Sequence, residues 1–275
     1  MKLIGESKET SAFLQDADTV LLVAKDELGF AKYKKQQVIY NMLDGKIKSV
    51  KIPGKVKLIE PCKKYPFGAM TISYVVGQAL DRNTCTDEQK IKLGKQMAKF
   101  IYELQILGEN LSAKEIGEIS KIETKTDAKA VDECLELIKP HLRDVEYRQL
   151  IQVSNIYKEI LAKRTRILCH NDLGGANMLV DEDKNIIGII DFECLGFYIP
   201  EYEFKHFMKQ DEIIFNSVVD EYHALSGVLV NDRKLMHICE IITMIINLRP
   251  RYKLGQEVVN FRVGIIRDLL QNYNN

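Results

Sequence analysis

Apolar residues near the start of the chain follow the spacing of β-strands. The β-branched run TVLLVA at 19–24 predicts a strand, and the polar segment KDELG at 25–29 is typical of a turn. Asp44-Gly45 marks the end of a short helix, since glycine commonly follows the last helical residue. The elements expected here are strands at 19–24 and 30–33, a helix at about 35–43, and strands at 56–59 and 70–76.

From residue 86 onward the apolar period becomes helical. Thr86 and Gln89 have the spacing of a capping box, which marks a helix start. The apolar residues that follow are expected to face a core: Leu93, Met97, Phe100, Ile101, Leu104 and Leu107. Further helices are expected at about 127–139, 147–163, 211–225, 234–247 and from 258 onward. This change of period predicts two lobes, mostly β over 1–76 and helical over 77–275, with 77–84 as linker.

The composition is typical of a globular protein. The 275 residues include 39 basic and 39 acidic side chains, and 46% are apolar. A net charge of zero argues against a nucleic-acid partner, and the longest nearly apolar stretch, 238–248, is too short to span a membrane. The start has no apolar signal segment and the six cysteines form no C-x-x-C pair. We therefore expect a cytoplasmic protein with reduced thiols and no zinc site.

Candidate chemistry is concentrated in the segment LCHNDLGGANMLVDEDKNIIGIIDFE at 168–193. His170 and Asp172 precede Asn177 with the spacing H-x-D-x-x-x-x-N, which is that of a kinase catalytic loop. Two apolar strands then flank the polar turn DEDKN, which predicts a β-hairpin with a five-residue loop. Asp191 ends the second strand of this hairpin.

The hairpin has a chemical consequence. In an antiparallel pair, Asn177 at the start and Asp191 at the end become neighbours. An amide oxygen and a carboxylate with open positions suit Mg²⁺, which takes its other ligands from water and nucleotide phosphates. Asp172 would then accept a proton from an attacking hydroxyl. His170 is expected to brace the loop by hydrogen bonding.

These motifs resemble the aminoglycoside phosphotransferase family of small-molecule kinases. HNDLGGANML followed by GIIDFE fits the family pattern, and KLGKQMAKFIYELQIL at 92–107 is similar to a family helix that usually ends in Leu-His, with Gln105 in place of that histidine. The segment 198–204 resembles the family's Asp-Pro-x-x-Asp segment. The subgroup acting on the 2″-hydroxyl is the most similar. The resemblance implies an α+β, bilobal protein-kinase-like fold.

The resemblance also implies a nucleotide site. Lys32 would be the strand lysine that holds the phosphates of ATP or GTP, with Lys34 and Lys35 as competitors for that role. In the family this lysine pairs with a helix Glu, but here Gln36 or Gln37 stands nearest. Residues 71–77 would form the hinge, where main-chain groups of Ser73 and Val75 face the base.

The acceptor is expected to be a small cation. Residues 1–80 carry a net charge of +5 and residues 170–250 a net charge of −8. A protein kinase is disfavoured, because Ile199-Pro200-Glu201 follows Asp191 too closely to enclose an activation loop. An aminoglycoside fits best, with choline, methylthioribose and homoserine kinases or a nucleotide-binding pseudokinase as alternatives. The candidate acceptor-binding residues are Glu193, Glu203, Asp211, Glu212 and Glu240, with Glu201 beside them.

Overall fold

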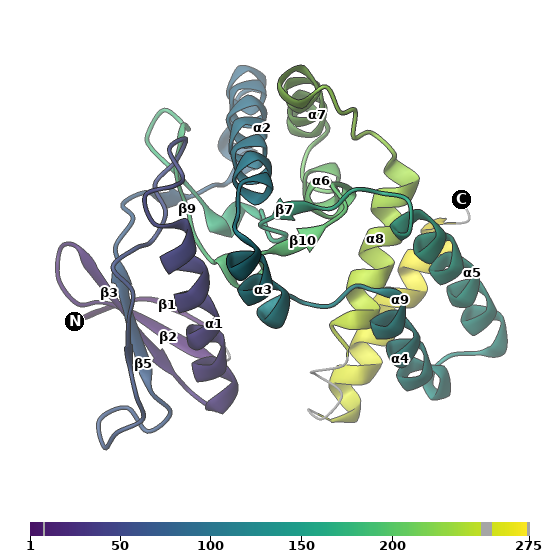
Figure 1. Ribbon diagram of the computed structural model, residues 1–275, viewed down its shortest axis with the longest axis horizontal. Helices are drawn as coiled ribbons and strands as arrows, with labels where there is room; N and C mark the ends of the chain where they lie inside the picture. The colour runs from purple at the N-terminus through teal and green to yellow at the C-terminus, as the bar shows by residue number, and fades with distance from the viewer. Residues whose placement is uncertain (8, 249–254, 274–275) are drawn as a thin grey trace.

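The first part of the chain is an antiparallel sheet covered by one helix (Figure 1). The computed structural model describes residues 1–7, 9–248 and 255–273. The five strands lie in the order β1-β2-β3-β5-β4, and helix α1 (Glu27–Leu43) packs on the sheet through Phe30 and Tyr33 against Ala24 and Met70. The strands are β1 (Lys2–Glu6), β2 (Thr10–Leu14), β3 (Thr19–Ala24), β4 (Lys57–Ile59) and β5 (Ala69–Ser73).

The start of α1 corrects the sequence prediction. Residues 30–33 are helical and do not form a strand, and the segment 25–29 begins the helix where a turn was expected. The reason is Asp26, whose side chain accepts a hydrogen bond from the amide of Gly29 (2.8 Å) and so caps the first turn. The strands that complete the sheet are β1 and β2, which the sequence analysis did not predict.

The rest of the chain is mostly helical. The capping box at Thr86 and Gln89 is confirmed, with both of its hydrogen bonds formed. The helices are α2 (Asp87–Glu109), α3 (Ala113–Ile122), α4 (Ala128–Ile138), α5 (Asp144–Leu161), α6 (Glu201–Met208), α7 (Glu212–Ser226), α8 (Arg233–Ile246) and α9 (Gln256–Tyr273). Two small sheets lie among them, β6-β8-β9 and β7-β10. Their strands are β6 (Gln78–Ala79), β7 (Ile167–Cys169), β8 (Met178–Val180), β9 (Ile186–Ile189) and β10 (Gly196–Tyr198).

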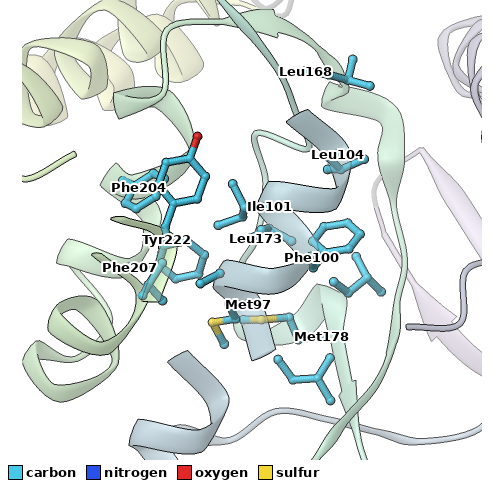
Figure 2. Packing of buried hydrophobic residues seen from close by; sticks show 14 of the residues in the cluster. Met97, Phe100, Ile101, Leu104, Leu168, Leu173, Met178, Phe204, Phe207 and Tyr222 are labelled. Carbon is cyan, nitrogen blue, oxygen red and sulfur yellow. The ribbon is translucent and has the colours of Figure 1, made fainter. Parts of the chain in front are cut away.

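Two large cores stabilise this part. In the first, α2 packs along α7 and meets residues of α1, α6 and the segment 168–178 (Figure 2). In the second, α4, α5, α8 and α9 pack together. The short strand β7 lies between them, because Leu168 belongs to the first core while Ile167 and Cys169 belong to the second. This strand runs directly into the segment that carries the candidate chemistry.

The segment between α1 and β4 fastens the sheet to the rest of the molecule. The carboxylate of Glu103 on α2 accepts hydrogen bonds from the amides of Lys48 (2.5 Å) and Ser49 (3.0 Å). The backbone of Lys51 donates to Ile187 O (3.0 Å) and accepts from Ile189 N (2.9 Å). This segment therefore ties α1 to both α2 and strand β9.

These observations confirm an α+β fold with an antiparallel sheet followed by a mainly helical part. The helices expected from residue 86 onward are present, and α3 and α6 are additional to them. The division into lobes after residue 76 stays a prediction. No helix within the described ranges has the length and apolar character that crossing a membrane requires.

Loss of the Leu104 side chain should test the first core. Leu104 is fully buried on α2, so Leu104→Ala should lower the free energy of unfolding by about 2–5 kcal/mol, because it leaves a cavity. Urea unfolding measures this change. Ile106→Ala on the same helix is the control, since that side chain is 38% exposed, and it should cost clearly less. Equal losses in the two variants would contradict the packing described here.

Candidate active site

The β8–β9 hairpin sets the frame of the site. Met178 pairs with Ile189, and the amide of Ile190 donates to Asn177 O (3.0 Å). The strands are joined by residues 181–185, so the predicted hairpin with a five-residue loop is confirmed. Asn177 and the residue before Asp191 therefore face each other across the pair. The geometry brings the two predicted metal-binding positions to the same end of the hairpin.

Asp172 is joined to Asn177 by hydrogen bonds. The side-chain nitrogen of Asn177, Nδ2, donates to the backbone oxygen of Asp172 (2.9 Å) and to Asp172 Oδ2 (3.0 Å). Burial raises the pKa of the Asp172 carboxyl and the nearby charge of Glu193 adds to the rise, although the Asn177 hydrogen bond acts in the opposite direction. With its nitrogen turned to Asp172, Asn177 keeps its oxygen for another partner.

His170 supports this arrangement from beneath. Its Nε2 lies 3.1 Å from Ile190 O, and its Nδ1 accepts from the amide of Asp172 (3.3 Å). Nε2 must therefore carry the hydrogen and donate. The ring packs edge-on against Phe192, with centroids 4.5 Å apart. The side chain is fully buried, and burial lowers its pKa to about 4. Its place in the structure agrees with the bracing role expected from sequence.

Helix α6 grips the loop at Asn171. This residue has a φ of 60°, in the left-handed region that asparagine tolerates better than most residues. Both carboxylate oxygens of Glu203 accept a hydrogen bond from the backbone amide of Asn171 (3.2 and 3.1 Å). Lys205 Nζ donates to the side-chain oxygen of Asn171 (2.9 Å). His206 Nε2 lies 3.1 Å from its carbonyl oxygen. Sequence reasoning did not find Lys205 or His206, because nothing near them marks contact with a loop some 34 residues earlier.

Asp191 is the second carboxylate of the site. It adopts a left-handed conformation (φ 63°), and Gln36 Nε2 on α1 donates to its Oδ1 (3.1 Å). Burial raises its pKa to about 6, and the charges of Glu193 and Asp172 contribute to the rise. The sequence left Gln36 or Gln37 as the residue nearest to the missing family glutamate, and Gln36 is the one that contacts Asp191.

The donor set fits Mg²⁺ that shares its coordination with phosphate. The Asn177 oxygen and the Asp191 carboxylate are hard oxygen donors, and the crowding of negative charge that raises the Asp191 pKa would be relieved by a cation. Within the described ranges, no three or more His, Cys, Asp or Glu side chains are grouped to hold a metal by themselves. A bound ion would therefore complete its coordination with phosphate oxygens and water.

Lys32 reaches the site from a helix, so its predicted position on a strand is wrong. It lies in α1, which begins at the Asp26 cap. Its Nζ is 3.1 Å from each carboxylate oxygen of Glu193 and 2.6 Å from Glu9 Oε2. The competing lysines behave differently. Lys34 is exposed and stacks over Phe30, and Lys35 is half-buried with a pKa lowered by burial.

The hinge residues are partly engaged within the sheet. The Ser73 amide donates to Gly54 O (2.8 Å), and the Ser73 hydroxyl accepts from the Gly54 amide (2.8 Å). The Val75 side chain is buried, and a Cβ added at Gly188 would lie 2.4 Å from it, so only glycine fits there. The Ser73 amide cannot also bond a base while it holds Gly54. Base contact through the main chain of Val75 stays a prediction.

The five acidic residues predicted for the acceptor do not form one open surface. Glu203 is fully buried and holds Asn171, so direct contact with an acceptor is excluded in this arrangement. The other four each pair with a cation of the chain: Glu193 with Lys32 (3.1 Å), Asp211 with Lys90 (2.8 Å), Glu212 with Arg233 (2.5 Å) and Glu240 with Lys209. Glu201 is also buried and pairs with Arg164 (2.7 Å). Of the four paired residues, Glu193 is the one whose charge acts on Asp172.

A family model decides what kind of protein this is. The model described as the phosphotransferase enzyme family matches residues 5–227, which include α1, the catalytic loop and α6. The chain belongs to the phosphotransferase enzyme family. The match confirms the family of this phosphotransferase that the HNDLGGANML and DFE motifs led us to expect. None of the curated proteins matches its sequence.

Solved structures confirm the kinase-like fold of this phosphotransferase. The GDP and kanamycin complex of APH(2″)-IIIa has a TM-score of 0.77 at 19% identity, over 98% of this chain and 93% of that one. The streptomycin–ATP complex of APH(2″)-IIa has a TM-score of 0.70 at 18% identity, over 98% and 90%. The macrolide 2′-phosphotransferase MphH from Brachybacterium faecium has a TM-score of 0.62 at 12% identity, over 94% and 88%. At these identities the likeness establishes the fold.

The buried state of His170 should appear in the pH dependence of stability. Its folded pKa of about 4 lies below the ordinary 6.5, so only the unfolded chain takes up this proton between pH 6.5 and 4. Stability should therefore fall as the pH drops through that window, by up to about 3 kcal/mol from this group. In His170→Gln the acid-side loss should be smaller. Urea unfolding between pH 4 and 7 measures it.

Glu203→Gln is the control of opposite sign. Burial raises the folded pKa of Glu203 to about 7, above its ordinary 4.5, so this group makes the folded state lose stability as the pH rises from 4.5 to 7. Removing it should steepen the acid-side loss relative to wild type. If both variants kept the wild-type slope, the buried states assigned to these two groups would be wrong.

Proposed function

We propose that this phosphotransferase is a small-molecule kinase. It would transfer the γ-phosphoryl group of ATP or GTP to a hydroxyl of a cationic acceptor, and an aminoglycoside is the best candidate. The observation that carries the proposal is that Asp172, Asn177 and Asp191 come together in one half-buried site of a chain from this family. The similar structures that contain GDP with kanamycin, or ATP with streptomycin, support the choice of donor and acceptor.

Each residue has a defined task in this reaction. Asn177 and Asp191 would hold Mg²⁺, which neutralises phosphate charge when bound, and Lys32 would contact the phosphates. Asp172 orients the acceptor hydroxyl and accepts its proton. A bond forms between the hydroxyl oxygen and the γ-phosphorus, the bond from that phosphorus to the bridging oxygen breaks, and the nucleoside diphosphate leaves with those electrons. Asp172 must be ionised to accept the proton, so the rate should fall as the pH drops through its raised pKa.

The charge around Asp172 supports a cationic acceptor. The Glu193 side chain is 26% exposed beside the catalytic loop, so it can contact both solvent and Lys32. Kinases for choline, methylthioribose or homoserine are the alternatives within this function. The pseudokinase alternative is weaker, because a chain that only bound nucleotide would not need Asp172 hydrogen-bonded to Asn177. The proposal places the enzyme in the cytoplasm, in accord with six cysteines that form no disulfide, all of them in the described part.

Replacing Asp191 should remove the metal dependence of nucleotide binding. In Asp191→Asn, Mg²⁺ should no longer increase the thermal stabilisation given by ATP or GTP, because a carboxylate ligand is lost. Thermal shifts with and without Mg²⁺ measure the effect. Asp183→Asn, at the exposed turn of the same hairpin, is the matched control and should keep the wild-type response. Retention of the Mg²⁺ effect in Asp191→Asn would refute the metal assignment.

A phosphorylation screen tests the proposed reaction itself. The wild-type enzyme is assayed with ATP and with GTP against aminoglycosides, choline, methylthioribose and homoserine, and product is detected by mass. With the best acceptor, Asp172→Asn should lower kcat by about 10²–10⁴-fold, the contribution of a positioned general base. Nucleotide affinity should stay near the wild-type value. If Asp172→Asn kept full kcat, Asp172 would not be the catalytic base, and if no acceptor were phosphorylated the pseudokinase would be favoured.

A further inference from the structure

Glu9 and Thr10, where β2 begins, are docked on the start of α1. Lys25 donates its amide to Glu9 O (3.0 Å), and the hydroxyl of Tyr33 donates to Thr10 Oγ1 (3.1 Å). A Cβ added at Gly29 would lie 2.6 Å from Glu9 O, so this close contact needs glycine. The backbone of Glu9 is therefore fixed against the helix, and its side chain is directed along α1 to Lys32.

Lys32 is shared between two carboxylates that differ in their freedom. Glu193 follows Asp191 by two residues and is held within the metal-binding segment. Glu9 directly precedes β2, and its Oε2 lies 2.6 Å from Lys32 Nζ. Burial lowers the Lys32 pKa, but the hydrogen bond to Glu9 and the charge of Glu193 outweigh it, so the pKa lies above its ordinary value. Lys32 thus stays a cation, and its charge also acts on Asp172 and Asp191.

We propose that the Glu9 carboxylate competes with the donor phosphates for Lys32 and gives up this ion pair when the donor binds. The proposal rests on the function proposed above. Lys32 pairs with Glu193, two residues after Asp191. A terminal phosphate bound beside Asp191 would therefore be able to contact Lys32. The Glu9 carboxylate then becomes a negative neighbour of the phosphate. Glu9 therefore limits donor affinity, and Lys32 exchanges Glu9 for phosphate when the nucleotide binds.

Strand β3 supplies no cation that could contact the donor phosphates in place of Lys32. Strand β3 has the sequence TVLLVA and carries no cation, and its residues Leu22 and Ala24 pack in the apolar cluster under α1. Lys25, which follows the strand, pairs with Glu6, so α1 is the element that offers cations to the phosphates here. Of the three lysines at 32, 34 and 35, Lys32 is the one paired with Glu193. Its position on the first turns of α1 is what brings it within reach of the β1–β2 turn as well.

Donor titrations of charge-neutral variants test the proposal. The probes are the Mg²⁺ complexes of non-hydrolysable ATP and GTP analogues, with affinity measured by calorimetry. Glu9→Gln should tighten donor binding by about two- to fivefold, the range expected for one partly exposed ion pair. Glu6→Gln removes the same charge from the neighbouring strand end, where Glu6 pairs with Lys25 (2.8 Å), and should leave donor affinity unchanged.

A double-mutant cycle assigns the effect to Lys32. In the Lys32→Met background, Glu9→Gln should no longer tighten donor binding. Unchanged or weaker binding in Glu9→Gln alone would overturn the proposal, since Glu9 would then be neutral or would orient Lys32 for the phosphate. Equal tightening with and without Lys32 would also overturn it. If the wild type bound neither analogue, the proposed function would fail together with it, whereas normal acceptor phosphorylation with no Glu9 effect would remove only this inference.

Discussion

The hydrogen bonds at Ile190, where the β8–β9 hairpin opens, hold together the two segments that carry Asp172, Asn177 and Asp191. The bond from Ile190 N to Asn177 O sets which residues stand at the open end of the pair. His170 is hydrogen-bonded to Ile190 O, so the catalytic loop is positioned by the residue that also bonds Asn177. The pairing of Met178 with Ile189 therefore decides which residues stand at this end of the hairpin.

The polar groups of the site are costly to assemble. Burial raises the pKa of Asp172 and of Asp191, and the nearby charge of Glu193 adds to both rises. Asn171 and Asp191 both adopt left-handed backbone conformations. Strain and crowded charge of this kind persist only where the surrounding structure holds them in place. Here α6 supplies three side chains to Asn171, and α1 supplies Gln36 to Asp191. The cost is characteristic of groups arranged for chemistry.

The local parts of the site could be predicted from sequence. The HND loop, the hairpin and the capping box at Thr86 each depend on residues a few positions apart, and each formed as expected. The start of α1 was missed because KDELG also fits a turn, and only the Asp26 cap and the packing of Phe30 and Tyr33 favour the helix. The partners of the acidic residues expected near the acceptor, and of Gln36, could not be predicted for a different reason. The partner of Asp211 is Lys90 and that of Gln36 is Asp191, and pairs so distant in sequence arise only from tertiary packing.

Strand β7 is only three residues long, yet one of its faces packs in the first core and the other face packs in the second. Leu168 and its neighbour Phe197 on β10 face the α2–α7 core, while Ile167 and Tyr198 face the core built from α4, α5, α8 and α9. His170 and Asp172 follow without an intervening loop, so a repacking in either core is passed to the catalytic loop through this ribbon. Laboratory evolution of the enzyme should therefore select activity-changing substitutions from both helical layers, many of them far from any bound substrate.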